Sequence, residues 1–149
     1  PNLALGIGSA VTYYATYFGG VERFRITNAG VVTIPGTLST AAYTETIVAL
    51  GTVAAAVTLA ITAGTFITAT LTTATACTFT MPTVAVGKSF ILYLRQPAAG
   101  TATTATFTNV KWGSAGAPTI TATVGKMDIL SFSSDGTAWY GAAAQGYTY

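Results

Sequence analysis

Hydrophobic and polar positions alternate with a period of two along much of the chain. Val57, Leu59 and Ile61, for example, are separated by Thr58 and Ala60. In a strand this spacing sends successive side chains to opposite faces. Threonine is the dominant polar residue, and with Val, Ile, Tyr and Phe it suits a pleated, half-buried surface. Alanine occurs in Thr-Ala alternations instead of the Glu/Lys/Leu patterns of helices, so the sequence predicts an all-β protein.

The first third of the chain predicts a short β segment of its own. Strands are expected over Thr12–Phe18, Val21–Thr27 and Val31–Ile34. Asn28-Ala29-Gly30 separates the last two, and Asn and Gly tolerate the positive φ angles of hairpin turns. A polar connection over residues 37–46 follows. We therefore predict two domains, an elongated β stalk or connector segment over residues 1–45 and a second domain over residues 46–149.

The second domain is expected to contain about eight short strands with turn signals between them. They are Ala54–Ile61, Phe66–Leu71, Thr78–Met81, Ser89–Arg95, Ala102–Phe107, Ile120–Thr123, Met127–Phe132 and Ala138–Gly141. Glycine, proline and aspartate mark most of the intervening turns. Short strands at this spacing are typical of a β-sandwich, and we predict a jelly-roll-like arrangement.

One expected strand is apolar on both of its faces. Phe90, Leu92 and Leu94 share one face, whereas Ile91 and Tyr93 occupy the other. A small sandwich normally leaves one face of each sheet in water, where polar side chains are found. The second apolar face is most simply buried against another copy of the same chain.

The charge content limits the partners that the protein can have. Its 149 residues include six Lys and Arg, four Asp and Glu and no His, for a net charge of +2. This leaves no basic stripe for phosphate contacts, so we expect no nucleic-acid partner. The long uncharged run around 47–67 is interrupted by Gly and Thr and alternates like a strand, so we expect no membrane insertion. Since the chain opens at Pro1, we take it as processed or as part of a longer protein.

Catalytic chemistry is not expected. Without His the chain lacks the usual general base and the commonest metal ligand, which argues against triads and metal sites. A glycoside hydrolase needs two carboxyl groups about 5 to 10 Å apart, and the acids are Glu22, Glu45, Asp128 and Asp135. Asp135 precedes Gly136 as in a turn, and Asp128 lies in an apolar strand. Cys77 is interpreted as a small buried residue. We predict a protein that is not an enzyme and has no cofactor.

Two stretches resemble virion proteins of tailed bacteriophages. The first runs from Glu22 to Thr37 (ERFRITNAGVVTIPGT) and is similar to a repeated unit of tail fibres, although Ile34-Pro35-Gly36-Thr37 departs from the usual Gly-x-Gly-Thr ending. The second comprises Val110–Gly113, Ala117–Thr119, Gly125–Leu130 and Asp135–Gly141, which look like a second phage virion module. Together the matches cover about a third of the chain.

The resemblance implies a homotrimeric, β-rich structural protein on the surface of the phage particle, a tail fibre or related appendage that contacts other virion proteins. Two alternatives stay open. One is a host-receptor binding module of a tail fibre, with a glycan or a surface protein as partner. The other is a capsid decoration or head fibre protein. In such fibres the C-terminal domain usually faces outward.

Two groups of residues are the candidate interaction sites. Phe24 and Ile26 lie two apart in an expected strand, so they share the face that would line the axis of a trimer. Arg23 and Arg25 are expected on the other face, where Glu22 can pair with one of them. In the second domain the candidates for receptor contact are the aromatic residues Trp112, Tyr147 and Tyr149, because such rings stack on sugars and form interface hot spots.

Overall fold

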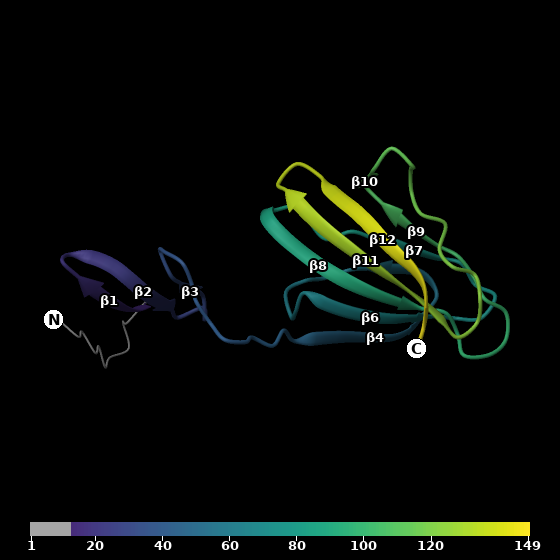
Figure 1. The fold of residues 1–149 in the computed structure, drawn as a ribbon, viewed down its shortest axis with the longest axis horizontal. Coiled ribbons are helices and arrows are strands. Elements are labelled where there is room, and N and C mark those ends of the chain that lie inside the picture. Colours follow the sequence, from purple (N-terminus) through teal and green to yellow (C-terminus); the bar gives the residue numbers. More distant parts are fainter. Residues whose placement is uncertain (1–12) are drawn as a thin grey trace. The chain divides into compact units, whose positions relative to one another are not determined.

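The computed structural model describes residues 13–149, and every regular element in this range is a strand (Figure 1). The predicted all-β class is confirmed. Thr12, the first residue of the first expected strand, lies outside the described residues. The chain divides into two compact units, Pro1–Tyr43 and Thr44–Tyr149. This division lies two residues before the domain boundary predicted from the sequence. No helix in the described range is long and apolar enough to cross a membrane.

The first unit contains one antiparallel sheet, in the order β1-β2-β3. Its strands are β1 (Tyr13–Phe18), β2 (Val21–Thr27) and β3 (Val32–Thr33). The turn between β2 and β3 is closed by hydrogen bonds from the Thr27 amide to the Val31 carbonyl and from the Gly30 amide to the Thr27 carbonyl, both 2.9 Å long. Gly30 has a φ of 75°, which glycine adopts at low cost. The hairpin predicted at this turn is confirmed.

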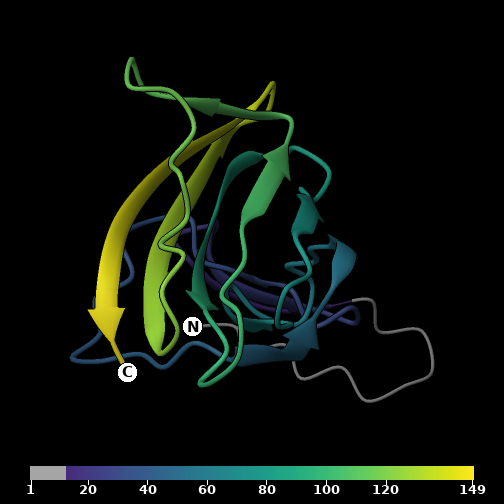
Figure 2. The same ribbon diagram turned by 90° about the vertical axis from the view of Figure 1, so that its right-hand side faces the viewer.

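The second unit contains two sheets (Figure 2). The larger has the order β10-β12-β11-β8-β6-β4, formed by β4 (Ile47–Val53), β6 (Phe66–Leu71), β8 (Val86–Arg95), β10 (Val110–Trp112), β11 (Lys126–Asp135) and β12 (Trp139–Thr148). The smaller has the order β5-β7-β9, formed by β5 (Ala55–Thr58), β7 (Cys77–Thr80) and β9 (Ala105–Thr108).

From β4 to β9, consecutive strands alternate between the two sheets. β4, β6 and β8 are parallel neighbours in the larger sheet, and β5, β7 and β9 are parallel neighbours in the smaller one. Two consecutive strands, one in each sheet, therefore form one coil (β4 with β5, β6 with β7, β8 with β9), and each coil stacks on the previous one. A jelly roll is built from antiparallel strands, so these parallel pairs depart from the predicted jelly-roll-like connectivity. Antiparallel pairing begins at β11, which joins β8 and β12.

The hydrophobic core of the second unit lies between its two sheets and receives side chains from both. In β8, Phe90, Leu92 and Leu94 are almost fully buried, whereas Ile91 on the opposite face is 36% exposed. Phe90, Leu92 and Leu94 therefore share one face of β8 and Ile91 lies on the other, as the sequence predicts. Trp139 of β12 is also buried, and its indole N–H donates a 2.8 Å hydrogen bond to the Pro82 carbonyl. This bond satisfies the one polar group of the ring, as a buried tryptophan requires.

Two buried polar side chains connect the loops to the larger sheet. Gln96 donates to the carbonyl oxygens of Thr103 and Thr121 and accepts from the Thr103 amide, with distances of 2.7, 2.8 and 3.0 Å. Asp128 accepts hydrogen bonds from the backbone amides of Thr121 and Gly146 and from the side chain of a neighbouring glutamine. These bonds satisfy polar groups that would be costly to bury unpaired.

Several elements differ from the sequence-based expectation, including β12, which was expected over Ala138–Gly141 and extends to Thr148. Ile120–Thr123 forms no strand. Ile120 lies in a loop and its side chain is buried in the core, and the Thr121 amide donates a hydrogen bond to the Asp128 side chain instead of to a neighbouring strand. β4 (Ile47–Val53) was not predicted, since the first strand expected after the polar connection was Ala54–Ile61. β10 was not predicted, because three residues are too few to show a period.

Candidate functional site

Phe24 and Ile26, the residues predicted to line a trimer axis, lie on one face of the β1–β2 pair. Phe24 is opposite Thr16 and Ile26 is opposite Tyr14 in the strand register. The rings of Tyr14 and Phe24 meet edge to face, with their centroids 6.5 Å apart. We call Tyr14, Phe24 and Ile26 the β1–β2 apolar face. Ile26 remains 38% exposed, so the described residues cover this face only in part.

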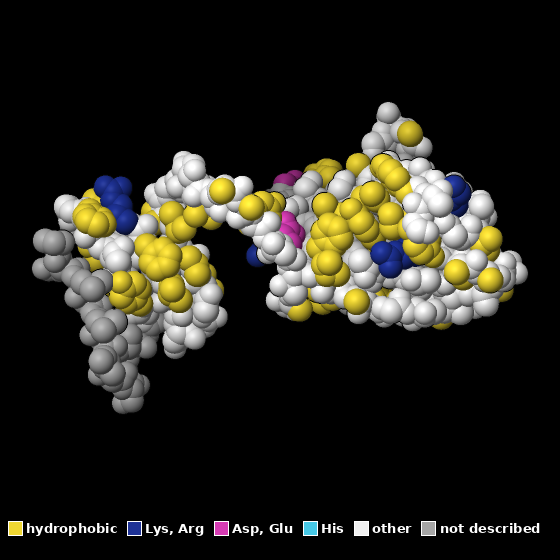
Figure 3. Space-filling model, turned by 60° about the horizontal axis from the view of Figure 1, so that its bottom comes forward, with side chains coloured by type: hydrophobic (Ala, Val, Ile, Leu, Met, Phe, Trp, Pro, Cys, Tyr) yellow, Lys and Arg dark blue, Asp and Glu magenta, His cyan; other side chains and the backbone are white. Residues whose placement is uncertain are grey.

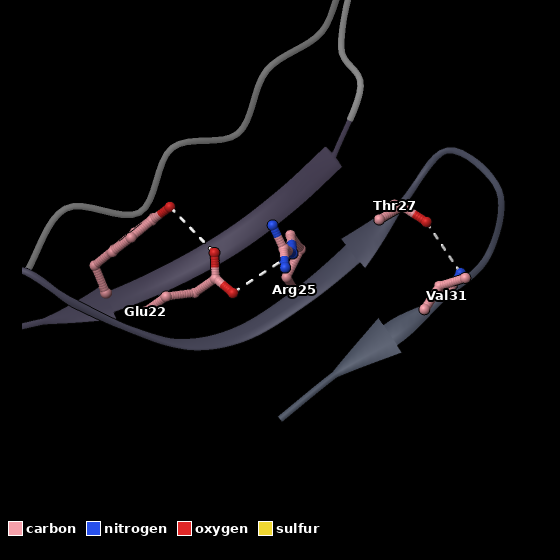
Figure 4. A network of polar contacts seen from close by, with 5 residues as sticks. Glu22, Arg25, Thr27 and Val31 are labelled. Carbon is pink, nitrogen blue, oxygen red and sulfur yellow. Dashed lines mark hydrogen bonds and ion pairs between the residues drawn. The ribbon is translucent and has the colours of Figure 1, made fainter. Parts of the chain in front are cut away.

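The opposite face carries an ion pair that a bulge makes possible. Arg25 Nε lies 3.5 Å from Glu22 Oε1 (Figure 4). Residues three apart point to opposite faces in a regular strand, but the register shifts between Thr16 and Tyr17, where β2 has one extra residue. The bulge places Glu22 on the same face of β2 as Arg25. It also means that the regular alternation expected from Arg23 to Arg25 does not hold through this part of β2.

The first unit buries little apolar surface. Among its described residues, Ala15 is the only hydrophobic side chain that is buried, at 5% exposure. Exposed large hydrophobic residues occur along its strands and the segment that follows: Tyr13, Tyr17, Phe18, Val21, Ile26, Val31, Val32, Leu38 and Tyr43. Hydrophobic side chains are accordingly prominent on the face drawn in Figure 3. A three-stranded sheet needs a covered hydrophobic face for independent stability, and residues 13–43 provide no such cover for this sheet.

Trp112 lies at the end of β10 and is half-buried. Its ring meets those of Phe107 and Phe132 edge to face, with centroids 5.9 Å apart in each case. It also covers Gly141, its partner in the parallel β10–β12 register. A Cβ at position 141 would lie 2.4 Å from the indole ring, so only glycine allows this approach. Trp112 is thus partly a packing residue, as well as a candidate for contact with a ligand.

A groove of about 500 Å³ begins at Trp112 and runs between the loop after β10 and the strand β12. Its lining is Trp112, Gly113, Ala115–Thr119, Gly141–Ala143 and Gln145. None of these residues is charged, and most are small. The run of small residues from Gly141 to Ala144 was the sequence signal for this hollow, and reasoning from aromatic residues alone missed it.

The terminal tyrosines are separated from this groove entrance. Tyr147 and Tyr149 lie near the far end of β12, six residues or more beyond the Gly141 that Trp112 covers, which is about 20 Å along a strand. Tyr147 is 44% exposed. The Tyr149 hydroxyl donates a 2.6 Å hydrogen bond to the Gln96 carbonyl, and its ring lies 5.1 Å from the Arg95 guanidinium carbon. The structure therefore does not bring the three predicted contact residues into one site.

Asp128 and Asp135 of the second unit accept hydrogen bonds from backbone amides. Asp135 Oδ1 accepts from the amides of Thr137 and Ala138, and its other oxygen accepts from the Tyr140 hydroxyl. These bonds, led by those from Thr137, hold the pKa of Asp135 well below its ordinary value. Asp128 lies seven residues earlier on β11, about 23 Å away along the strand. That separation exceeds the 5 to 10 Å that paired glycosidase carboxyl groups need.

Cys77 and the remaining acids form no ligand cluster. Cys77 is 1% exposed in β7, and burial raises the pKa of its thiol, which agrees with the small buried residue expected from the sequence. Within residues 13–149 no group of three His, Cys, Asp or Glu residues is placed to hold a metal ion.

Comparisons with known proteins return no match to a protein-family model, to a curated protein or to a solved structure.

Proposed function

We propose that this chain is a structural protein of a bacteriophage virion, a homotrimeric fibre or appendage on the particle surface. Its first unit associates with the same unit of other copies, and its second unit is displayed as a β-sandwich. The phage assignment rests on the two sequence stretches that resemble tail-fibre and virion modules. The observation that carries the structural role is the first unit's sheet, in which Ala15 is the only buried hydrophobic side chain among the described residues.

The β1–β2 apolar face supplies the contact between copies. Three copies of Phe24 and Ile26 around an axis give each apolar side chain apolar neighbours, and burial of such surface contributes about 25 cal/mol per Å². The Glu22–Arg25 ion pair lies on the other face and is half-buried there. Because it is made within one chain, it does not join copies, so association depends on the aromatic and aliphatic residues.

The proposal is tested by measuring the molar mass of the purified full chain by light scattering at micromolar concentration. We expect about three times the 15.1 kDa of one chain. Replacing Phe24 by Ser is expected to lower this mass, because it places a hydroxyl on the proposed axis. Arg23→Ser on the same strand is the matched control and should leave the mass unchanged. A stable wild-type monomer contradicts the proposal.

The virion location needs a separate measurement. We expect the chain among the proteins of purified particles of the phage that encodes it, and we expect an antibody against the second unit to label their surface. Labelling on the tail supports a fibre, whereas labelling over the head supports the alternative of a capsid decoration or head fibre protein. Particles that lack the chain contradict both.

A second candidate function is binding of a host-surface glycan or protein, and the groove beside Trp112 favours it. The groove is uncharged and has an aromatic side chain at one end, a combination found in sites for small polar ligands. Adsorption of the trimer to host cells tests this function. If the end of the groove at Trp112 binds the receptor, Trp112→Ala should reduce adsorption with the trimer intact, whereas Tyr147→Ala and Tyr149→Ala, near the opposite end of β12 from Trp112, should not.

A further inference from the structure

The larger sheet of the second unit has an open edge on each side. β10 covers β12 only from Trp139 to Gly141, and in the described residues no strand pairs with that side of β12 from Ala142 to Thr148. At the other side of the sheet, β4 pairs only with β6. An open edge presents unpaired N–H and C=O groups and is a template for another strand.

Neither edge carries the charged side chains or prolines that protect many exposed edges, and the protective feature that is present, a β-bulge, occurs on both. β4 reads Ile-Val-Ala-Leu-Gly-Thr-Val, and β12 from Ala142 reads Ala-Ala-Ala-Gln-Gly-Tyr-Thr. Natural proteins protect exposed edges with Lys, other charged residues or Pro, and these two segments contain none of them. Both edges are therefore chemically suited to accept a strand.

The two edges also match each other in position. Strand register defines a row of neighbouring residues across the sheet, which runs Ile47, Phe66, Ile91, Ser131 and Ala142. β4 begins on this row, and β10 ends at Trp112, opposite Gly141, one residue before the same row on β12. The strand β4 thus starts at the level where β12 loses its partner.

The bulges of the two edges fall at the same level. A second row runs Ala49, Thr68, Tyr93, Ile129 and Ala144. β4 has its extra residue immediately after Ala49, and β12 has its extra residue immediately after Ala144. Each bulge contains a glycine with positive φ, 67° at Gly51 and 82° at Gly146. Since bulges bend a strand and increase its twist, strands that bend at the same level stay in contact.

We propose that the free edge of β12 pairs with β4 of a second copy, parallel and head to tail, with Ala144 opposite the second copy's Ala49. The direction fits, because β4 and β12 run the same way in the sheet. This inference rests on the self-association proposed above and assigns a surface to it in the second unit.

Pairing at this register covers exposed apolar atoms. Ile47, which is 61% exposed, comes to lie beside Ala142 of the neighbouring copy. Val48 comes to lie beside Ala143, which lines the groove next to Trp112. Lys111 on β10 and Glu45, two residues before β4, place opposite charges near the junction. The groove thus becomes part of the contact between copies, and this pairing excludes the use of the groove as the receptor site of the trimer.

The number of copies decides whether the contact closes. A head-to-tail contact forms a ring if its operation is a rotation that closes and an open filament if it does not. In the proposed homotrimer the contact occurs three times, and the three copies form a ring.

Disulfide cross-linking tests the register. In a Cys77→Ala background, the full chain with Ala49→Cys and Ala144→Cys is oxidised and run on a non-reducing denaturing gel. Both alanines are exposed in the single chain. Directly opposite residues on neighbouring strands lie about 5 Å apart, within the range for a disulfide, so we expect a covalent trimer. Ala49→Cys with Ala142→Cys is the mismatched control, since a shift of two residues moves the pair beyond about 7 Å.

Each outcome has one interpretation. A covalent trimer from the matched pair, with little from the mismatched pair, supports the proposal, and adding Ile47→Lys to the matched pair should then abolish the cross-link. A trimer by light scattering without this cross-link overturns the edge pairing and leaves the proposed function standing. A monomer overturns both. A cross-linked ladder that extends beyond the trimer overturns ring closure.

Discussion

Removing the carboxylate of Asp128 should destabilise the second unit strongly. Asp128 is 1% exposed and accepts three hydrogen bonds, 2.7 Å from the Thr121 amide, 2.9 Å from the Gly146 amide and 3.1 Å from Gln145 Nε2. These bonds join β11, the bulge of β12 and the loop that precedes β11. Asp128→Ala leaves two backbone amides without an acceptor.

The size of the effect follows from those two amides. A buried donor without a partner costs about 1 to 3 kcal/mol, and water entering the space left by the carboxyl group recovers part of that cost. We expect a loss of about 3 kcal/mol in the free energy of unfolding, which lowers the Tm of a domain of this size by roughly 10 °C. Urea unfolding and calorimetry of Asp128→Ala and Asp128→Asn measure it. Ser131→Ala, an exposed position on the same strand, is the control and should change stability by less than about 0.5 kcal/mol.

The same carboxylate should make stability depend on pH. Burial alone raises the pKa of Asp128, but the hydrogen bonds from Thr121, Gln145 and Gly146 outweigh burial and hold the pKa below its ordinary value. A group with a depressed folded-state pKa stabilises the fold above the pKa of the unfolded chain, about 3.9 for Asp. That contribution disappears as pH falls through the folded-state value. Asp128→Asn should therefore lose less stability than the wild type between pH 7 and pH 2.5. If Asp128→Asn equals the wild type in stability at pH 7, the structural reasoning about this carboxylate is wrong.

Three further outcomes are expected. Gly141→Ala should displace Trp112, because the new methyl group would overlap the indole ring, and a red shift of tryptophan fluorescence would reveal the movement; an unchanged spectrum contradicts the packing described. Cys77 should react with a thiol reagent only after unfolding, since burial both shields it and raises its pKa, and rapid labelling of the native chain contradicts this. Trp139→Phe should destabilise the second unit by about 1 to 3 kcal/mol in urea unfolding, since it leaves the Pro82 carbonyl without its donor and a space beside the ring.

The sequence predicts strands well where each has one fully covered face. β6 has the bounds predicted, Phe66–Leu71, because buried and half-buried residues alternate along it without interruption. The alternation fails in β4, where the bulge at Gly51 shifts the period. It fails again in the second half of β12, whose side chains from Ala142 onward are exposed on both faces. Edge strands with bulges are therefore not predicted by a search for hydrophobic residues with a period of two.

The candidate site was predicted only in part, because its geometry depends on pairing between distant segments. The sequence indicates that Trp112 and Tyr147 are aromatic residues near loops. It does not indicate that β10 pairs in parallel with β12 at Gly141. This pairing places Trp112 beside the beginning of β12, whereas Tyr147 lies near its end. Parallel pairing has no local turn signature, so the open edges could not be derived from residue patterns, and the run of small residues after Trp139 was the one sequence signal for the groove.

The coiled connectivity from β4 to β9 also has an evolutionary consequence. Each coil contributes one strand to each sheet and pairs in parallel with the coil beside it. Duplicating or deleting one whole coil would lengthen or shorten both sheets together while keeping the hairpin of β11 and β12 at one side and the strand β4 at the other. Gene duplication within this segment can therefore change the width of the domain without redesigning its two edges.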